Sequence, residues 1–506
     1  MSLFNGIIKS MAREYSTKLA LIDGDIVLTY AQLAEEVESF AGALTALSLT
    51  SDSKLGILCL NQKENLIALL GGFLSGVPVV PMNPLLTLDD LIFITKDAGI
   101  DNLLISNVFV KPEIASFAKL FKTIIVTDSQ FLAFKLANVT TFKKFLENAP
   151  TFFGKRKRKE DDPDILLYTS GTTARPKGVP LREEQFFDNT GAFLDHLELS
   201  QNDRCIVALP MFHSFGNIMV LSLLRVGGTI VFVPQFQPKT ILAKIAEHKA
   251  TVLPLVPTIY AFLVELAAKD SYNISSLRLC ISGGASLPEA LLKKVEKTLG
   301  VTVLEGYGLT ETAPVISVNR MKDGSVPGSV GPVLSNLEIK IVDESGKPLP
   351  RKEIGEILVK GSTVMKGYWH SPEETKQVFT EDGWFCTGDL GHLDERDFLY
   401  ISAGRKKDLI IRAGENISPL AVENTLMNHP FVREVSVVGV SDPRVGERVK
   451  ACVILLEGVS ATEADIKEFC RKKLPLFMKP DIVRFYKAFP KTATGKVIKA
   501  QLREDL

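Results

Sequence analysis

The sequence predicts an α/β protein: a large N-terminal domain of layered βαβ subdomains, a small β-rich subdomain, and a small α+β C-terminal module. Short apolar strand-like runs alternate with helix-like stretches up to about residue 330. The pattern changes to short alternating strands near Gly331 and changes again after Gly404. With 506 residues, the chain is roughly three times as long as a typical domain of about 150 residues. These observations favour a multidomain protein.

The first helix and strands follow from local patterns. Thr29 and Gln32 have the spacing of a capping box. The helix after them has apolar residues on one face, namely Leu33, Val37, Phe40, Leu44 and Leu47. A buried strand, LGILCL, precedes a helix that begins at about Glu64. The short strands that follow are VPVV, NLLI and TIIV, and after Asp164 they are ILLY, CIVAL, TIVFV, TVLPL, LRLCI and VTVLE.

The second half divides at two points. We expect an N-terminal domain over residues 1–404, whose β-rich subdomain covers about 331–404 and contains the strands LEIKIVD, GEILVKG and FLYIS. The C-terminal domain, residues 405–506, contains LIIR, VREVSVVGV and VKACVILL. It has 19 basic and 13 acidic residues, a net charge of +6, so the rest of the neutral chain carries −6.

Composition excludes several classes of protein. The 59 basic and 59 acidic residues balance, so the chain lacks the charge of a general nucleic-acid binder. Its 46% hydrophobic and 23% charged residues are typical of soluble globular proteins. None of the six cysteines lies within four residues of another, which argues against a zinc or redox motif and favours buried reduced thiols. This usage fits the cytoplasm.

Apolar stretches near residues 65–88 and 205–224 are interrupted by proline and glycine. They therefore favour a buried strand and helix over a membrane span. The N-terminal segment resembles no targeting signal, since it lacks a long apolar run and a small-residue cleavage site.

One run of positive charge, Lys155 to Lys159, precedes three acidic residues. The plain interpretation is a solvated linker. The alternative is contact with an anionic surface, either the inner face of a membrane or an acidic carrier protein.

A polar loop follows the buried strand Ile165–Tyr168. Its candidate phosphate-binding residues are Thr169, Ser170, Gly171, Thr172, Thr173 and Lys177. Glycine frees backbone N–H groups, which together with hydroxyl donors can surround phosphate oxygens. A Walker A loop ends in Gly-Lys-Ser/Thr, whereas Pro176 precedes Lys177 here, so this is a different phosphate loop.

This loop resembles the phosphate loop of the adenylate-forming superfamily, which includes acyl-CoA synthetases, luciferases and peptide-synthetase adenylation domains. Further motifs of that superfamily recur in order, at residues 209–216 (LPMFHSFG), 305–312 (EGYGLTET), 384–390 (WFCTGDL), 404–408 (GRKKD) and 490–496 (PKTATGK). The resemblance covers nearly the whole chain. It implies ATP-dependent activation of a carboxylate as an acyl-adenylate, with release of pyrophosphate and transfer of the acyl group to a thiol.

The resemblance also implies roles for individual residues. Glu311 resembles the magnesium ligand, and Thr310 the residue that holds the α-phosphate. Tyr307 would stack on adenine beside the Gly306 carbonyl. Asp389, helped by Arg405, would accept the ribose hydroxyls. His213 would separate the acyl pocket from the adenylate. Gly284, Ala285 and Lys407 are further candidate cofactor-binding residues. Taken alone, Asp389 fits a turn, Glu311 a helix cap and His213 a core histidine.

The resemblance further implies a mobile C-terminal lid. Lys496 would meet the carboxylate and the α-phosphate during adenylation only. Lys407 would be the hinge about which the lid rotates, which exchanges Lys496 for the loop Gly414-Glu415-Asn416. A net charge of +6 suits a lid that closes on phosphates.

The acid is expected to be apolar. Amino-acid-activating relatives carry a carboxylate near the 212–215 motif, whereas residues 205–224 contain no acidic residue. The pocket candidates are apolar or small: Phe212, Phe215, Ile218, Gly283, Gly284, Ala285, Gly308 and Ala313. A medium- or long-chain fatty acid is therefore the first choice, since each buried methylene contributes about 0.8 kcal/mol. An aryl acid is the second choice.

Gly308 has two interpretations. It either forms the mouth of an acyl channel or lies in a turn that needs positive φ.

The expected co-substrates are ATP with Mg²⁺, and coenzyme A as the thiol. An acyl carrier protein is the rival acceptor, because residues 209–216 also resemble bacterial acyl-acyl-carrier-protein synthetases. A different class, a nucleotide-binding regulator without catalysis, is opposed by the presence of Lys496, Glu311 and Asp389.

Overall fold

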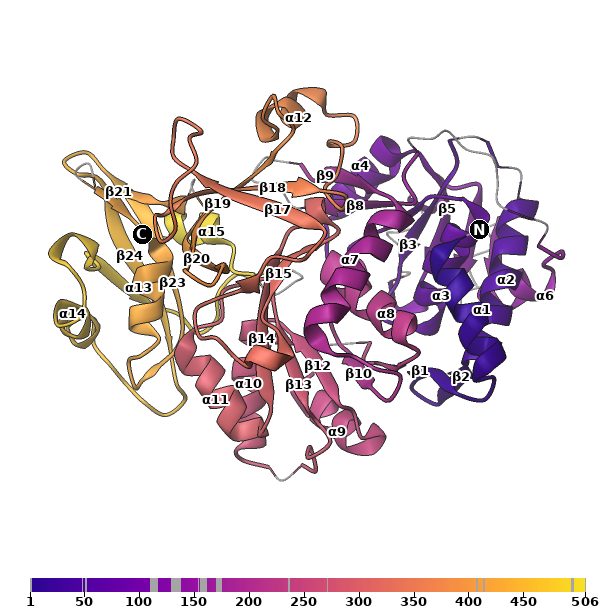
Figure 1. Cartoon of the computed structure of the whole chain (residues 1–506), viewed down its shortest axis with the longest axis horizontal. Coiled ribbons are helices and arrows are strands. Elements are labelled where there is room, and N and C mark those ends of the chain that lie inside the picture. The colour runs from indigo at the N-terminus through magenta and orange to yellow at the C-terminus, as the bar shows by residue number, and fades with distance from the viewer. Residues whose placement is uncertain are drawn as a thin grey trace.

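The structure is a computed structural model that arranges the chain around four β-sheets (Figure 1). It describes residues 2–47, 49–50, 52–109, 117–128, 138–152, 154, 162–169, 175–234, 237–270, 272–405, 408–412, 415–492 and 496–505. Within these ranges, the expected alternation of strands and helices is confirmed up to β14 (Thr302–Gly308).

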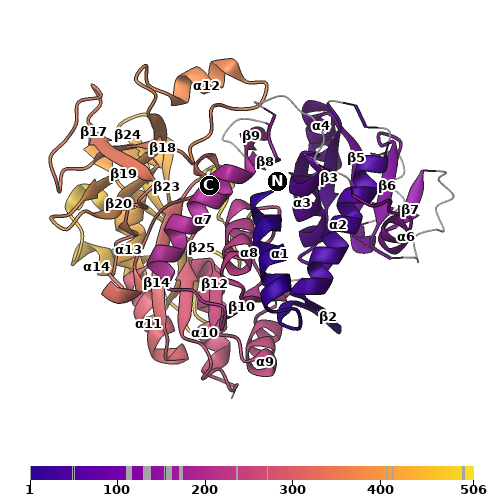
Figure 2. The same ribbon diagram turned by 45° about the vertical axis from the view of Figure 1, so that its right-hand side comes forward.

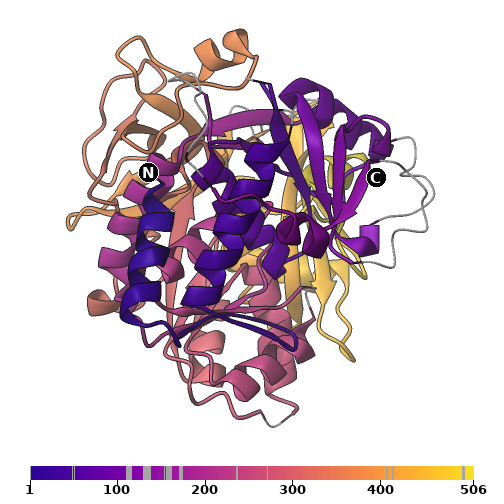
Figure 3. The ribbon, with the colours of Figure 1, turned by 90° about the vertical axis from the view of Figure 1, so that its right-hand side faces the viewer.

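A seven-stranded sheet contains the strands predicted from the N-terminal part of the chain. Its order is β7-β6-β5-β3-β4-β8-β9, parallel except for the last pair. The strands are β3 (Lys54–Leu58), β4 (Val79–Pro81), β5 (Ile100–Ile105), β6 (Thr123–Val126), β7 (Val139–Thr141), β8 (Ile165–Thr169) and β9 (Lys177–Leu181). The helices of this region are α1 (Leu3–Glu14), α2 (Tyr30–Ala46), α3 (Lys63–Ser75), α4 (Leu88–Ala98) and α6 (Phe142–Glu147), with the short η1 (Asn107–Phe109). Figure 3 shows the indigo helices beside the purple strands.

Helix α2 begins as its sequence predicts. The Thr29 backbone N–H donates to the Gln32 side chain at 2.9 Å, and the Gln32 N–H donates to the Thr29 hydroxyl at 3.3 Å. The predicted apolar face is buried at Leu33, Val37, Phe40 and Leu44, while Leu47 lies just beyond the last turn.

An eight-stranded sheet follows, in the order β15-β14-β13-β12-β10-β11-β1-β2. Its central pairs are parallel and its two edge pairs, β14–β15 and β1–β2, are antiparallel. The remaining strands are β1 (Leu19–Asp23), β2 (Ile26–Thr29), β10 (Arg204–Val207), β11 (Thr229–Phe232), β12 (Val252–Leu255), β13 (Leu279–Ser282) and β15 (Val315–Val318). Its helices are α7 (Glu183–Leu197), α8 (Ser214–Val226), α9 (Pro238–His248), α10 (Pro257–Ala267) and α11 (Glu289–Leu299), with the short η3 (Thr310–Thr312) and η4 (Met321–Asp323).

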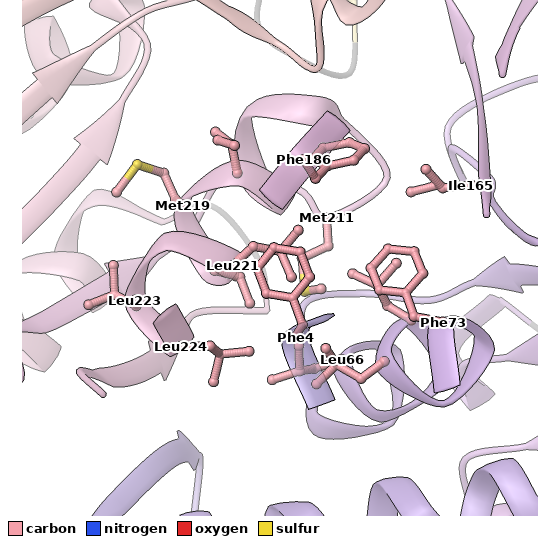
Figure 4. Packing of buried hydrophobic residues seen from close by; sticks show 14 of the residues in the cluster. Phe4, Leu66, Phe73, Ile165, Phe186, Met211, Met219, Leu221, Leu223 and Leu224 are labelled. Carbon is pink, nitrogen blue, oxygen red and sulfur yellow. The ribbon is translucent and has the colours of Figure 1, made fainter. Parts of the chain in front are cut away.

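The largest buried cluster joins the two sheets. It combines apolar side chains of α1, α2 and α3 with those of α7 and α8. Figure 4 shows Phe4 of α1 among Leu66 and Phe73 of α3 and Leu221 of α8. The mostly apolar sequence of α8 is thus explained by burial inside the protein. Among the described helices, none is long and apolar enough to cross a membrane.

The β-rich part forms an antiparallel five-stranded sheet in the order β16-β20-β19-β18-β17. Its strands are β16 (Gly331–Pro332), β17 (Leu337–Val342), β18 (Gly355–Gly361), β19 (Phe385–Leu393) and β20 (Phe398–Arg405), with α12 (Pro372–Val378) beside them. In Figure 2 the orange strands of this sheet lie next to the yellow C-terminal part.

The C-terminal part has its own five-stranded sheet, in which β22, β21, β24 and β23 follow one another and β25 pairs with β24. The elements are β21 (Ile410–Arg412), β22 (Glu415–Ile417), α13 (Pro419–Leu426), β23 (Val432–Asp442), β24 (Gly446–Leu455), α14 (Glu463–Arg471), η6 (Leu476–Met478), β25 (Ile482–Phe485) and α15 (Lys499–Glu504). One buried cluster fills each face of this sheet. All six cysteines are free and five are buried, as expected, while Cys386 is half-buried.

Candidate functional site

The expected phosphate loop connects two paired strands. Thr169, the last residue of β8, lies opposite Lys177, the first residue of β9. Ser170, Gly171, Thr172 and Thr173 lie outside the described residues. The hairpin brings the two described ends of the loop together, so that Thr169 and Lys177 flank it.

Glu311 is connected to this hairpin through an aromatic residue that the sequence analysis missed. The Tyr368 hydroxyl donates to Oε1 of Glu311 at 2.9 Å. Nζ of Lys177 lies over the ring of the same tyrosine, 5.3 Å from its centroid. The only sequence signal was two adjacent aromatic residues, Tyr368 and Trp369, after a glycine.

His213 lies at the start of helix α8, and Thr310, the first residue of η3, contacts that helix start. The hydroxyls of Thr310 and Ser214 are 3.3 Å apart. His213 caps α8, because its Nδ1 accepts the N–H of Phe215 at 3.3 Å. The histidine therefore fixes the start of the helix whose first residue contacts Thr310.

His213 is neutral at neutral pH. Burial and, secondarily, the positive charge of Lys496 lower its pKa to about 3. Lys496 can act on His213 in this way only because the C-terminal part brings it to the large domain.

The expected adenosine residues also come together. The Tyr307 hydroxyl donates to Oδ2 of Asp389 at 2.7 Å, and Asp389 is buried with its backbone N–H bonded to the Thr387 hydroxyl. Arg405 lies opposite Asp389 in the β19–β20 ladder. Gly306 precedes Tyr307 on β14. The Tyr307–Asp389 bond thus joins β14 of the eight-stranded sheet to β19 of the antiparallel five-stranded sheet, beside the end of β20.

Lys496 reaches the large domain at Gly284. A Cβ on Gly284 would lie 4.0 Å from Cε of Lys496, and Gly284 has a φ of +79°. Gly284 and Ala285 are both exposed at the end of β13. The lid thus carries its lysine to an open glycine turn beside β14. Lys407, the expected hinge, and Gly414, the first residue of the expected exchanged loop, lie outside the described residues, whereas Glu415 and Asn416 begin β22.

The expected acyl pocket has an aromatic wall. The Phe215 ring edge lies 3.1 Å from where a Cβ on Gly283 would stand, and the Gly306 carbonyl oxygen lies 3.6 Å from that point. Phe212 is half-buried, whereas Ile218 and Ala313 are fully buried and belong to the large core cluster.

Gly308 is required by the backbone, but not because of a turn with positive φ. Its φ is not positive, so no turn requires glycine on that ground. A Cβ at this position would lie 2.1 Å from the carbonyl oxygen of Pro314 and 3.0 Å from Cα of Val315. Glycine is required because β14 passes close to the backbone that enters β15, so the missing side chain does not open a channel.

The donor set near Glu311 fits magnesium bound with a nucleotide. In the described ranges, no three histidine, cysteine or carboxylate side chains are grouped closely enough to hold a metal. Mg²⁺ commonly takes one or two protein carboxylates and completes its shell with phosphate oxygens and water. Glu311 can supply such a carboxylate.

Glu305, at the start of the 305–312 motif, is buried and accepts the Leu287 N–H at 2.8 Å. Burial raises the pKa of its carboxyl to about 8, so it is largely protonated at neutral pH. We assign it a structural place under the site, since its carboxyl group accepts from the backbone of the β13–α11 connection.

Together these residues place a phosphate-loop hairpin, a carboxylate, a threonine hydroxyl and a lysine cation around the strand ends β13 and β14. A tyrosine and an acidic residue that suit a nucleoside lie beside them. Such an arrangement can neutralise a polyphosphate while a carboxylate approaches it.

Comparison with known proteins identifies two family domains in the chain. A sequence model of the AMP-binding enzyme family matches residues 8–369, and a model of the AMP-binding enzyme C-terminal domain matches residues 421–496. The chain is 33% identical to the long-chain-fatty-acid–CoA ligase of Bacillus subtilis, over 99% of this chain and 94% of the relative.

Solved structures match over the same length. ATP-bound MatB from Rhodopseudomonas palustris superimposes with a TM-score of 0.88 at 32% identity, covering 99% of this chain and 98% of that protein. The anthranilate CoA ligase AuaEII, in complex with anthranoyl-AMP, superimposes with a TM-score of 0.90 at 28% identity, covering 99% and 96%.

Proposed function

Because the chain belongs to the AMP-binding enzyme family and is an AMP-forming acid–CoA ligase, we propose that the acid it activates is a medium- or long-chain fatty acid. In the first half-reaction the acid attacks the α-phosphate of ATP, which forms acyl-AMP and releases pyrophosphate. In the second, the thiol of coenzyme A attacks the acyl carbon and AMP leaves.

The site residues divide this work by their chemistry. Lys177, Thr169 and the 170–173 loop would hold the phosphates, and Glu311 would hold magnesium together with phosphate oxygens. Lys496, beside Gly284, would neutralise charge that develops between the carboxylate and the α-phosphate. Tyr307 and Asp389 would bind adenine and ribose.

One observation carries the substrate class. The start of α8, which contacts Thr310 through Ser214, presents Phe215 toward Gly283, and residues 205–224 have no acidic side chain. An ammonium group would have no counter-charge on this helix. An alkyl chain gains about 0.8 kcal/mol for each methylene that it buries.

An aryl acid is the second candidate. The edge of the Phe215 ring beside the Gly283 backbone supplies an aromatic surface on which a planar ring could pack. The structural similarity to an anthranilate CoA ligase also favours an aryl acid.

We also propose that the domain boundary lies at Gly404–Arg405, where β20 ends, and that Lys407 is the hinge. Rotation there would remove Lys496 from Gly284 after adenylation. An acyl carrier protein remains the alternative acceptor, and contact of Lys155–Lys159 with a membrane or carrier protein stays a prediction, since these lysines lie outside the described residues.

The test is a panel of acids read by mass spectrometry. Saturated acids of about two to sixteen carbons, benzoate, anthranilate, cinnamate and several amino acids are each incubated with ATP, Mg²⁺ and either coenzyme A or acyl carrier protein. Pyrophosphate–ATP exchange is measured in parallel, and Glu311→Gln serves as the matched inactive control.

We expect the enzyme to convert the longer saturated acids to their coenzyme A thioesters, at rates that rise with chain length. A maximum among benzoate, anthranilate or cinnamate would replace the fatty acid with an aryl acid. Product on carrier protein alone would change the acceptor. Exchange without any thioester would contradict the ligase assignment.

A further inference from the structure

We propose that Tyr368 is a positioning residue that couples the phosphate-loop hairpin to the carboxylate of Glu311, so that nucleotide and metal are bound as one unit. The inference rests on the proposed function, because it gives Glu311 the metal and Lys177 the phosphates. Tyr368 touches neither the acid nor the thiol in this account. It acts through the two residues that it contacts.

Tyr368 lies on a segment that connects helix α7 with the phosphate-loop hairpin of β8 and β9. Residues 363–369, which we term the strap, follow β18 and precede α12. At its beginning, the Gln185 side chain of α7 donates to the carbonyls of Thr363 and Val364, at 3.3 and 2.9 Å. At its end, the Trp369 N–H donates to the Gly178 carbonyl of β9 at 2.8 Å. The strap is therefore fixed both to the core helix and to the phosphate-loop hairpin.

The strap is also fixed to the residue that would hold the metal. The Met365 N–H donates to the backbone carbonyl of Glu311 at 2.8 Å, and Met365 is buried in the large core cluster. The Tyr368 hydroxyl donates to the side chain of the same glutamate at 2.9 Å. Backbone and carboxylate of Glu311 are thus both oriented by one seven-residue segment.

Further bonds restrict the tyrosine itself. Its N–H donates to the Thr375 hydroxyl at 2.9 Å, and the next residue, Trp369, donates its indole N–H to the Asp97 carbonyl at 3.1 Å. These bonds set the backbone on both sides of the tyrosine. The hydroxyl therefore reaches Glu311 from a fixed backbone position.

The two ends of the Tyr368 side chain have different partners. The ring face lies under Nζ of Lys177, and the hydroxyl points to Oε1 of Glu311. The aromatic face attracts the cation, and the hydroxyl proton stabilises the carboxylate in one rotamer. Partners that orient a metal-binding carboxylate typically change metal affinity about 10–100-fold when they are removed.

This arrangement separates two consequences of substitution. Tyr368→Phe keeps the ring under Lys177 and removes only the hydroxyl, so it should affect metal-dependent binding alone. Tyr368→Leu also removes the ring, and should in addition weaken the binding of ATP without metal by about 2–5-fold, the size of one exposed cation–π contact.

The measurement is the affinity of the full-length chain for ATP by calorimetry, in EDTA and in saturating Mg²⁺. The ratio of the two dissociation constants is the gain that the metal provides. Binding of Mn²⁺ in the presence of ATP, followed by electron paramagnetic resonance, reports the metal directly. Tyr30→Phe is the matched control, because the buried Tyr30 hydroxyl donates to the Gly228 carbonyl at 2.7 Å, a comparable single bond of a different element.

We expect Tyr368→Phe to reduce the gain from the metal about 10-fold while its dissociation constant in EDTA stays within about 2-fold of the parent chain. Tyr30→Phe should leave both constants unchanged and lower only the melting temperature. In a Glu311→Gln background the gain should be lost already, and Tyr368→Phe should add nothing, because the two residues act as one unit.

Four results would overturn the inference. Equal weakening of ATP binding with and without metal would make Tyr368 a general structural residue, as would the same effect of Tyr368→Phe in both backgrounds. A full metal gain in Glu311→Gln would remove Glu311 as the ligand and leave Tyr368 nothing to position. A parent chain that binds no ATP in either condition would contradict the proposed function itself, and with it the inference.

Discussion

Cε of Lys496, from the C-terminal domain, lies 4.0 Å from the Cβ position of Gly284 at the end of strand β13. The same lysine helps to lower the pKa of His213 at the start of α8. One lid cation therefore acts on two elements of the large domain. The described arrangement is the one expected for adenylation, in which the lid lysine faces the carboxylate and the α-phosphate.

A second contact supports this closed arrangement. The Arg433 guanidinium of β23 lies 4.5 Å from the ring centroid of Phe262 on α10. Arg433→Ala should lower pyrophosphate exchange about 2–5-fold, since an exposed cation–π contact contributes about 0.5–1 kcal/mol. Thioester formation from synthetic acyl-AMP should be unaffected. Arg444→Ala, at an exposed arginine of the same domain, is the control, and equal loss in both half-reactions would show that Arg433 does not favour the adenylation arrangement.

A substitution at the proposed hinge, Lys407, should have the opposite effect on the two half-reactions: it should spare adenylation and slow thioester formation. Proline fixes φ near −65°, so Lys407→Pro should stiffen the connection between the domains. Pyrophosphate exchange should continue, because the lid already faces the site, while thioester formation should fall at least about 10-fold. Stopped-flow or quenched measurements of each half-reaction check this. Normal rates in both half-reactions would show that the hinge lies elsewhere.

Substitutions at Gly308 show whether this glycine is needed for backbone packing or selects the chain length of the acid. A Cβ there meets the Pro314 carbonyl at 2.1 Å, so even Gly308→Ala should destabilise the fold, by about 1–3 kcal/mol or more, and Gly308→Trp should do so more strongly. Both should lower activity for all acids alike. Thermal unfolding and the acid panel check the prediction. A stable Gly308→Trp variant that prefers acetate would restore the channel interpretation.

Glu305 should make stability depend on pH. Its pKa is about 8 in the folded chain, and that of an unfolded glutamate is about 4.3, so the folded state holds the proton more firmly. This contribution is fully present below about pH 4.3 and is lost as the pH rises through about 8. Glu305→Gln keeps an acceptor for the Leu287 N–H but has no proton to lose.

Urea unfolding at about pH 5 and about pH 9 measures this effect. Relative to the parent chain, Glu305→Gln should gain on the order of 2–4 kcal/mol between the two pH values. If the difference in stability between Glu305→Gln and the parent chain is the same at both pH values, Glu305 is not protonated in the folded chain.

The predictable parts of the fold depend on residues that are close in sequence. The capping box of Thr29 and Gln32, the apolar face of α2 and the strand before the phosphate loop are visible in short windows, and the structure confirms the helix and the strand β8. The order of the strands could not be predicted in this way, because β1 pairs with β11, some two hundred residues away, and no local pattern shows that pairing.

The same distinction applies to the site. Thr310 and Glu311 are evident from their motif, whereas Tyr368, which contacts Glu311, is 57 residues away in the chain. The misinterpretation of Gly308 has a similar cause, since the carbonyl that requires glycine belongs to Pro314 and approaches only after β14 and β15 pair. Residues that act through a neighbour in space leave little trace in a single sequence.

We propose that the lid supplies Lys496 for adenylation and withdraws it for thioester formation. The most direct measurement compares the two half-reactions of Lys496→Ala, with Lys487→Ala as a control from the same domain. We predict that pyrophosphate exchange falls about 10²–10³-fold, the usual effect of removing one charge-stabilising group. Conversion of synthetic acyl-AMP and coenzyme A to thioester should stay within about 3-fold of the parent rate. Equal losses in both half-reactions would contradict the account and make Lys496 a structural residue.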